Sequence, residues 1–431
     1  MKFLKRGSAV HLVEAAAPTD QVRAMLDAIR TGGEEQITSY ARDLDRWMGD
    51  IVVSPDAIEA AHRAVPQRLK DDIAYAHDNI RRFAEAQLAS CRDTEVEVQP
   101  GLFAGQKLIP VSAAGCYVPG GRYSHIASAI MTVTTARTAG VSAISACSPP
   151  REGGVPPEIL FTLDYCGADR ILALGGVQGI AALAYGLFGT RPADILVGPG
   201  NQYVAEAKRL LFGNVGIDMV AGPTDSLILA DATADAEFVA MDLVGQAEHG
   251  YNSPVWLATD DEGLAEQVLA LVPQCIAGLP PLNRENAQLA WDRYAEVVLC
   301  SDREEMARFA DDKAPEHLHV QADDNDWWLS RLRSYGSLFL GAETTVAFGD
   351  KASGPNHVLP TSGAARYTGG LSALKFLKVV TWQRVERAAV RDLAQVTARI
   401  SRHEGMEGHA RTADIRLKKF FPDEVFDLGT I

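Results

Sequence analysis

The chain has 431 residues, of which 47% are apolar and 23% charged, a composition typical of globular proteins rather than of disordered segments or coiled coils. This length predicts two or three domains with sizeable cores. The formal net charge is −15, from 41 Lys and Arg against 56 Asp and Glu. This charge argues against nucleic-acid and anionic-membrane partners, because the electrostatic field of the protein would repel phosphate. Even a small anionic substrate would need local cations.

The first part of the chain, from residue 17 to about residue 93, is predicted to be helical. Apolar residues recur every three or four positions in DQVRAMLDAIRTGG and in DAIEAAHRAVPQRLKDDIAYAHDNIRRFAEAQL. We expect Gly32 and Gly33 to stop the first helix. From about residue 105, short β-rich runs that end in Gly or Pro alternate with longer helical runs, from KLIPVSAAGCYVPGG to QYVAEAKRLLFG. This alternation is typical of βα units on a parallel sheet.

A second run of the same kind extends from SLILAD to SLFLG, and a glycine- and threonine-rich loop and a charged, mainly helical tail follow. We therefore expect an α/β chain with two Rossmann-like parallel-sheet modules, a helical N-terminal region and an extended helical C-terminal tail. The expected division is an arm over 1–16, a discontinuous first α/β domain over 17–115 and 226–365, a second α/β domain over 116–225, and a tail over 366–431. The tail either packs on its own subunit or reaches a partner.

The cysteines and the N-terminus indicate in which cellular compartment the protein is expected to occur. The six cysteines are scattered without a C-x-x-C spacing, which fits neither a disulfide framework nor a thiolate metal site. The N-terminus MKFLKRGSAVHLVEAAAP lacks a long apolar run before a cleavage site, and no stretch of eighteen apolar residues occurs. These features indicate a soluble, cytoplasmic protein.

Four glycine-rich turns are candidate ligand sites, since ligands of open α/β sheets bind beyond the carboxyl ends of strands, at helix N-termini. None of them is a G-x-G-x-x-G fingerprint, and each alone is more often a simple tight turn, although four in one chain weaken that interpretation. The four turns are CYVPGG (116–121), GGVQG (175–179), GPGNQY (198–203) and AGPTDS (221–226).

A helix that ends in VGQAEHG places Gln246 and His249 at positions i and i+3, on one face, where an amide oxygen and an imidazole can converge on a cation. The alternative is that Gln246 caps the helix and His249 complements its dipole. Further ligands could be Asp350, in FGDKASGPNH, and His409, in EGMEGH, although the first is otherwise a turn residue and the second a surface histidine. Such a shell suits zinc.

The motif APEHLHV pairs a carboxylate, Glu316, with an imidazole, His317, just before a predicted strand. Histidine titrates near neutrality and suits a general base, so the pair could serve two proton transfers. The alternative is a solvated pair at the start of a strand.

Seven blocks occur in the order found in the histidinol dehydrogenase family, which the chain resembles over nearly its whole length: GGVQGIAALAYG, VGPGNQYVAEAKR, IDMVAGP, QAEHG, APEHL, GPNHVLPT and EGMEGHARTA. The resemblance implies an enzyme that depends on zinc, one ion per subunit, and on NAD. Such an enzyme oxidises a primary alcohol through an aldehyde to a carboxylate with two NAD. It also implies an intertwined homodimer whose C-terminal tail crosses to the other subunit.

The resemblance also assigns roles to residues. It implies that Gln246, His249 and Asp350 bind the metal from one subunit, with His409 supplied by the partner, and that Glu316 and His317 are the acid/base pair. It implies NAD contacts from Tyr117, Gln178 and Asn201. The residues expected to face the substrate are Thr224, Gln246, His249, His317, Asp350, Lys351, Glu404, His409, His125 and Arg122.

Departures from the usual family pattern concern the substrate. GPSE is replaced by GPTD, with Thr224 and Asp225, GDY by GDK, with Lys351, and the segment after PGG is RYSHIAS, with Arg122 and His125. Added positive groups should weaken the binding of cationic histidinol. GRYSHIAS, TTVAFGDKASGPNHVLPT and ARISRHEGMEGHARTAD are similar to the sulfopropanediol 3-dehydrogenase branch, which implies oxidation of 2,3-dihydroxypropane-1-sulfonate to sulfolactate.

Lys351, Arg122 and His125 are candidate donors to the sulfonate of a small anionic polyol. Alternatively, Arg122 binds the NAD pyrophosphate and Lys351 pairs with a carboxylate of its own subunit. Three other functions stay open: oxidation of histidinol, oxidation of a different anionic polyol, and a catalytically silent binding or scaffold role.

Overall fold

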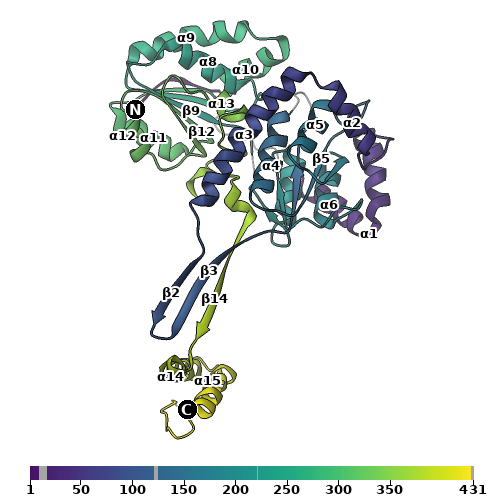
Figure 1. Ribbon diagram of the computed structural model, residues 1–431. Helices are drawn as coiled ribbons and strands as arrows, with labels where there is room; N and C mark the ends of the chain where they lie inside the picture. The colour runs from purple at the N-terminus through teal and green to yellow at the C-terminus, as the bar shows by residue number, and fades with distance from the viewer. Residues whose placement is uncertain (9–16, 121–124, 221, 429–431) are drawn as a thin grey trace. The chain divides into compact units, whose positions relative to one another are not determined.

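The computed structural model describes residues 1–8, 17–120, 125–220 and 222–428. The chain divides into two compact units, the first made of residues 1–88 and 111–376 and the second of residues 89–110 and 377–431. Each unit contains strands and helices of its own (Figure 1). The domain boundaries expected from the sequence remain a prediction.

The first unit contains a five-stranded sheet whose pairings are all parallel, in the order β6-β5-β4-β7-β8. The chain starts in the middle, at β4, and winds outward in both directions, as in a doubly wound fold. The strands are β4 (Ala113–Tyr117), β5 (Ala143–Ser148), β6 (Arg170–Ala173), β7 (Ile195–Val197) and β8 (Gly216–Ile217). The helices between them are α4 (Ile126–Thr138), α5 (Pro157–Tyr165), α6 (Gly176–Tyr185) and α7 (Gln202–Leu211).

Both faces of this sheet are covered. Helices α4 and α5 share one apolar core with Cys116 and Ile144, and α6 and α7 share another with Leu172 and Leu196. The helices of the N-terminal region, α1 (Thr19–Leu44), α2 (Pro55–Ala64) and α3 (Gln67–Ala89), add to these two cores. Inside α1, Gly33 leaves the helical conformation, with φ 58° and ψ −138°. The predicted stop is confirmed, and a second helical stretch follows it directly.

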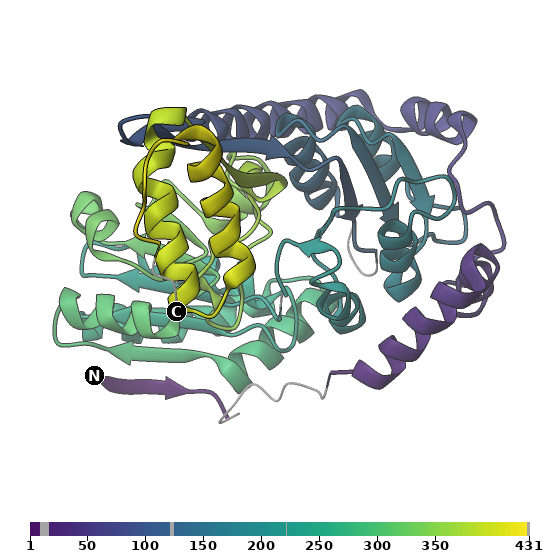
Figure 2. The same ribbon diagram turned by 90° about the horizontal axis from the view of Figure 1, so that it is seen from below.

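The second sheet of this unit has six strands in the order β1-β11-β10-β9-β12-β13. Apart from β1, which pairs antiparallel with β11 at one edge (Figure 2), the strands are parallel. The central strand β9 again comes first in the α/β run, so the two sheets share one winding pattern. The strands are β1 (Lys2–Arg6), β9 (Ser226–Ala230), β10 (Val255–Thr259), β11 (Glu296–Leu299), β12 (His317–Gln321) and β13 (Ser337–Leu340). The expected α/β class with parallel sheets is confirmed.

Helices cover the six-stranded sheet on both faces (Figure 1). On strand β12, Leu318 and Val320 belong to the core under α11 and α12, whereas His319 and Gln321 contact Asp242 of α8 on the opposite face. This alternation is that of an extended strand. The helices are α8 (Ala236–Ala247), α9 (Glu262–Ala277), α10 (Pro281–Tyr294), α11 (Arg303–Lys313), α12 (Asn325–Arg331) and α13 (Val346–Lys351), followed by short 3-10 turns η1 (Ala364–Arg366) and η2 (Ala373–Phe376).

The second unit combines an antiparallel sheet, in the order β14-β3-β2, with a pair of helices. The prediction of a mainly helical tail missed strand β14, because neither face of this strand is buried and no period-two alternation marks it in LKVVTWQRV. The elements are β2 (Thr94–Gln99), β3 (Leu102–Pro110), β14 (Leu377–Val385), α14 (Arg387–His403) and α15 (Glu407–Phe420). Across the described ranges of both units, no helix is long and apolar enough to span a membrane.

The burial of the cysteines predicts which of them react. The thiolate is the reactive species, and burial raises the pKa of the Cys116 and Cys166 thiols to about 12. We expect a thiol reagent at pH 8 to label native protein at Cys91 and Cys275, which are partly exposed, and to spare the four buried cysteines, Cys116, Cys147, Cys166 and Cys300. Peptide mass spectrometry measures this. Labelling of Cys116 as fast as that of Cys91 would contradict the fold.

Candidate active site

Glu316 and His317 lie at the amino ends of the central strands of the six-stranded sheet, where His317 is opposite Ser226 in the β9–β12 pairing. The AGPTDS turn likewise leads directly into β9. This edge of the sheet is the opposite of the one at which open α/β sheets usually bind ligands. Gln246 and His249 lie at the carboxyl end of helix α8. The candidate site is therefore located where α8 ends and strands β9 and β12 begin.

Asp225, which the sequence marked only as a departure from the family pattern, holds Glu316 in place. Its carboxylate accepts the backbone N–H of Glu316 at 2.7 Å and that of Ser362 at 3.0 Å. In return, the Asp225 N–H donates to Glu316 Oε2 at 3.3 Å, and the His317 N–H donates to the Asp225 carbonyl at 3.2 Å. The available signal was an acidic residue directly before an apolar strand, a position at which burial requires partners.

His317 is buried between two carboxylates. Its Nδ1 lies 3.8 Å from Glu316 Oε2, and its Nε2 lies 3.5 Å from Asp350 Oδ1. Neither ring nitrogen has a hydrogen-bond partner among the described residues. The alternative of a solvated Glu–His pair does not match this geometry, because the two side chains are only 7% and 3% exposed. A buried imidazole with free nitrogens is well placed to exchange a proton with a ligand.

Asp350, near the end of α13, is the meeting point of three histidines. Its Oδ2 lies 3.7 Å from His249 Nε2, and its backbone carbonyl lies 2.8 Å from His357 Nδ1. A carbonyl only accepts, so Nδ1 of His357 carries the proton, and its Nε2 can accept from the Ser128 hydroxyl of α4 at 3.2 Å. His357, which the sequence assigned no role, thus links the loop after Asp350 to the five-stranded sheet.

Of the four residues expected to bind zinc, His249 and Asp350 bring donor atoms that zinc accepts close to each other. The buried Gln246 Oε1 has no hydrogen-bond partner among the described residues and is available as a ligand. Two ligands of a tetrahedral zinc lie roughly 3.3 Å apart, close to the 3.7 Å between His249 Nε2 and Asp350 Oδ2. Within the described ranges, no three His, Cys, Asp or Glu side chains form a metal-binding group.

Burial and mutual charge shift the pKa values in this site. Burial raises the pKa of Glu316 to about 8, and the neighbouring carboxylates of Asp225 and Asp350 add to the rise. Burial alone would lower the pKa of His317, but Glu316 and Asp350 outweigh it and raise the value to about 9. Burial likewise opposes the ionised form of Asp350, yet His317 and His249 hold its pKa well below the usual range. Such perturbed groups in one desolvated place are typical of catalytic sites.

The cationic residues expected near the substrate have different surroundings. Burial lowers the pKa of His125 to about 4, helped by the nearby His357 imidazole and the positive charge of Lys351, so His125 is a neutral hydrogen-bond donor and not an added charge. Lys351 is exposed at the end of α13 and forms no ion pair with a carboxylate of the described residues. Thr224 is half-buried directly before Asp225, and Arg122 lies outside the described residues.

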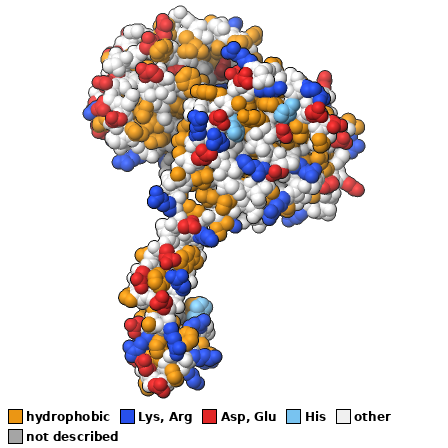
Figure 3. Space-filling model, in the orientation of Figure 1, with side chains coloured by type: hydrophobic (Ala, Val, Ile, Leu, Met, Phe, Trp, Pro, Cys, Tyr) orange, Lys and Arg blue, Asp and Glu red, His pale blue; other side chains and the backbone are white. Residues whose placement is uncertain are grey.

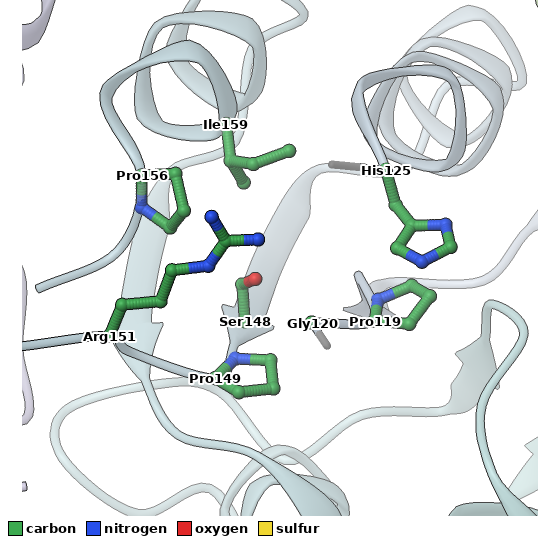
Figure 4. Close-up of a pocket in the computed structure, with 8 residues that line it drawn as sticks. All are labelled: Pro119, Gly120, His125, Ser148, Pro149, Arg151, Pro156 and Ile159. Atoms are coloured by element: carbon green, nitrogen blue, oxygen red, sulfur yellow. The ribbon is translucent and has the colours of Figure 1, made fainter. Parts of the chain in front are cut away.

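His125 also lines a small pocket at the carboxyl ends of β4 and β5. Figure 4 shows the Arg151 guanidinium and the His125 ring on opposite sides of this pocket, with the Ser148 side chain between them. The lining residues are Pro119, Gly120, His125, Ser148, Pro149, Arg151, Pro156 and Ile159. The sequence analysis did not single out Arg151.

The three residues expected to contact NAD lie at the carboxyl ends of strands in the five-stranded sheet, and each has a structural partner. The Tyr117 hydroxyl accepts the N–H of Gly176 at 3.1 Å. Gln178 donates to Asp45 at 2.9 Å, and Asp45 also accepts the N–H of Gly175 at 3.1 Å. Asn201 caps α7 by accepting from the N–H groups of Tyr203 and Val204. Asp45, which the sequence did not single out, thus occupies the start of α6 with a carboxylate.

The GPGN turn after β7 requires glycine. At Gly198, φ is +116°, and a Cβ would lie 2.1 Å from the carbonyl oxygen of Tyr117. We expect Gly198→Ala to lower the free energy of unfolding by about 2 kcal/mol or more and to raise KM for NAD, because strand β4 must shift. Urea unfolding and initial rates measure both.

Gly213 supplies the matched control for this turn. Its φ is +103°, but a Cβ there would meet nothing within 4 Å. Gly213→Ala therefore reports backbone strain alone, and we expect it to leave KM for NAD unchanged. Equal effects of the two variants on KM would contradict a specific role of the GPGN turn.

Two expected site residues belong to the second unit. Glu404 follows α14 and His409 lies in the first turn of α15, and both side chains are exposed. Their roles at the substrate and the metal remain predictions.

The comparisons with known proteins agree with the ordered sequence blocks. The family model described as histidinol dehydrogenase matches residues 11–417. The chain belongs to the histidinol dehydrogenase family. Within this family, a sulfopropanediol 3-dehydrogenase of Ruegeria pomeroyi is 63% identical over 99% of both chains, and a histidinol dehydrogenase homologue of the same organism is 69% identical over 94% of this chain and 93% of its own.

A solved member of the histidinol dehydrogenase family has the same fold. The crystal structure of histidinol dehydrogenase from Elizabethkingia anophelis is 33% identical, covers 96% of this chain and 94% of its own, and superposes with a TM-score of 0.90. These matches confirm the resemblance on which the residue roles were based.

Proposed function

We propose that this protein oxidises the primary alcohol of 2,3-dihydroxypropane-1-sulfonate through an aldehyde to 3-sulfolactate, with two NAD per substrate and one zinc ion per subunit. The observation that carries the proposal is the 63% identity to a sulfopropanediol 3-dehydrogenase over 99% of the chain. Lys351, next to the candidate metal ligand Asp350 and unpaired among the described carboxylates, supports an anionic substrate. His125 would donate a neutral hydrogen bond to the same anion.

The candidate site contains groups for each step of this reaction. Zinc would be held by Gln246, His249 and Asp350 together with His409 of the partner subunit. When bound, it would supply Lewis-acid stabilisation to the substrate hydroxyls. In its neutral form, which the pKa of about 9 makes predominant only at alkaline pH, His317 would accept the proton of the reacting hydroxyl as the hydride passes to NAD, which leaves an aldehyde. Glu316 would take a proton from the water that adds to this aldehyde, and His317 would return its proton to the aldehyde oxygen, which gives the hydrate. His317 would then accept a proton from the hydrate as the second hydride leaves, and the carboxylate product forms.

A substrate panel tests the proposed function. Purified zinc-loaded protein is assayed with both enantiomers of the sulfonate diol, with histidinol and with glycerol, and NADH is counted per substrate consumed. We expect two NADH per molecule of one sulfonate enantiomer and a much lower kcat/KM for histidinol. Faster oxidation of histidinol would establish the alternative function in the same family, and a protein without zinc or any activity would favour a silent scaffold.

The surface of the second unit supports the proposal of a homodimer. Apolar side chains are exposed on this surface among charged ones (Figure 3). Exposed apolar side chains of this kind are typical of a surface that a partner covers. They include Val96 at 57%, Val379 at 61%, Ile400 at 54% and Ile415 at 51% exposure. A second copy that covers this surface would bring its own tail to the candidate metal site.

Complementation between inactive variants tests the shared site. If His409 serves the partner's metal, a mixed dimer of His249→Ala and His409→Ala chains has one intact site. Coexpression should then restore roughly a quarter of the wild-type activity. No restoration, with mixed dimers demonstrated by mass spectrometry, would place His409 and His249 of one chain in the same site.

A further inference from the structure

Behind the candidate active site lies a second polar cluster to which the proposed chemistry assigns no role. It consists of Asp242 on α8, His319 and Gln321 on β12, and Thr345 directly before α13, and is called the Asp242 cluster below. His319 is fully buried and Asp242 is 19% exposed on its side chain. Buried polar groups of this kind are costly unless they satisfy one another, so their placement calls for a physical reason.

The Asp242 carboxylate is the centre of the cluster. Its Oδ1 accepts from the Thr345 hydroxyl at 2.8 Å, and its Oδ2 accepts from Gln321 Nε2 at 2.7 Å and lies 3.4 Å from His319 Nδ1. The amide of Gln321 is turned so that its nitrogen faces this carboxylate, and its oxygen has no partner within the described ranges. One carboxylate therefore joins a helix, a strand and the start of a second helix.

The cluster extends to the neighbouring strand through His319. The Nε2 of this residue lies 3.1 Å from the carbonyl oxygen of Gly341, which follows β13. Since that carbonyl only accepts, Nε2 carries a proton and donates. The Thr345 hydroxyl, in turn, does not cap α13, although Thr345 is the residue at the N-cap position. It donates instead to Asp242, so the start of α13 is anchored to α8.

Each element joined by Asp242 also carries a candidate site residue at a fixed offset. Asp242 precedes Gln246 by four residues on α8, which places both on one helix face. His319 follows His317 by two residues on β12, which places both on one strand face, and both rings lie near Phe339. Thr345 directly precedes the six-residue helix α13, which ends with Asp350 and Lys351.

We infer that Asp242 is a positioning residue that fixes Gln246, His317 and Asp350 relative to one another by joining the three elements that carry them. The inference rests on the proposed function for the identity of that site. Carboxylates that orient metal ligands from outside the coordination sphere typically contribute 10–100-fold to metal affinity or activity. The Asp242 cluster does so through backbone elements and not by contact with the ligands.

Zinc affinity of the purified holoenzyme, measured by competition with a chelator, tests this inference without an activity assay. In Asp242→Asn, one of the two acceptor oxygens becomes a donor that faces Thr345 or Gln321. We expect zinc to bind roughly 10–100-fold more weakly and kcat to fall more than KM changes. Thr345→Val removes a single donor at nearly constant volume and should weaken zinc binding by a smaller factor, which keeps the test open if Asp242→Asn folds poorly.

Asp311 provides a matched control in the same unit. Its carboxylate, 21% exposed, accepts from Arg331 at 3.1 Å and from the backbone N–H groups of Arg333 and Ser334 at 2.8 and 3.0 Å. Asp311→Asn should lower the unfolding midpoint but leave zinc affinity and kcat unchanged. If Asp242→Asn and Thr345→Val behave like this control, the inference is overturned. Failure of the wild type to oxidise the sulfonate, with zinc affinity still sensitive to Asp242, would overturn the substrate proposal alone.

Discussion

His317→Asn should lower kcat by a factor of about 10²–10⁴ while the protein retains its zinc. The imidazole lies 3.5 Å from Asp350 and has two ring nitrogens without partners among the described residues, so it can exchange a proton. Asparagine has a similar volume but cannot act as a base near neutral pH. Steady-state rates and metal analysis by mass spectrometry on the same preparations measure the two effects.

His249→Ala is the paired variant for this experiment. His249 faces Asp350 Oδ2 at 3.7 Å and is a candidate metal ligand, so its removal should lower both the zinc content and the rate. The two histidines would then separate chemistry from metal binding. Equal loss of zinc in both variants would contradict the assignment of His317 as the base.

Lys208→Met should destabilise the five-stranded sheet by about 3–5 kcal/mol, because it leaves a buried carboxylate without its counter-ion. Lys208 and Asp218 form an ion pair whose side chains are only 3% and 0% exposed. Lys208 also donates to the Gly198 carbonyl at 2.9 Å, and Asp218 accepts the Gly198 N–H at 2.7 Å. The pair therefore holds both sides of the GPGN turn, and urea unfolding monitored by fluorescence measures the loss.

A double-mutant cycle with Asp218→Asn shows whether the charge is responsible. Asparagine can still accept the Gly198 N–H but is neutral, so the double variant should be less destabilised than the sum of the two single variants. Lys313→Met serves as a control, since its pair with Glu296 is more exposed, at 26% and 23%, and should contribute less than about 1 kcal/mol. Strict additivity in the Lys208 cycle would contradict a direct charge interaction.

Local patterns in the sequence predicted the α/β modules and the residues that meet at the candidate site. The alternation of short β-rich runs with helical runs depends only on neighbouring residues, and the spacing of Gln246 and His249 follows from helix geometry. The proximity of Asp350 to both His249 and His317 came from the family resemblance, because no local rule relates positions so far apart in the chain.

Other features depended on tertiary contacts that no pattern reports. The general rule for parallel sheets places ligands at the carboxyl ends of strands, but Glu316 and His317 lie at the amino ends of β9 and β12, where helix α8 ends. The neutral state of His125 follows from burial beside Lys351 and His357, which are distant in sequence. Strand β14 was missed because β pairing with β3 forms it without a buried face.

The loop after Asp350 has a mechanical consequence. His357 contacts the Asp350 carbonyl with one ring nitrogen and Ser128 with the other, and Asn356 donates to the Met131 carbonyl and to the Thr135 hydroxyl on the same helix, α4. Any rotation of one sheet against the other, such as a hinge closure around a nucleotide, would pull on the backbone of Asp350.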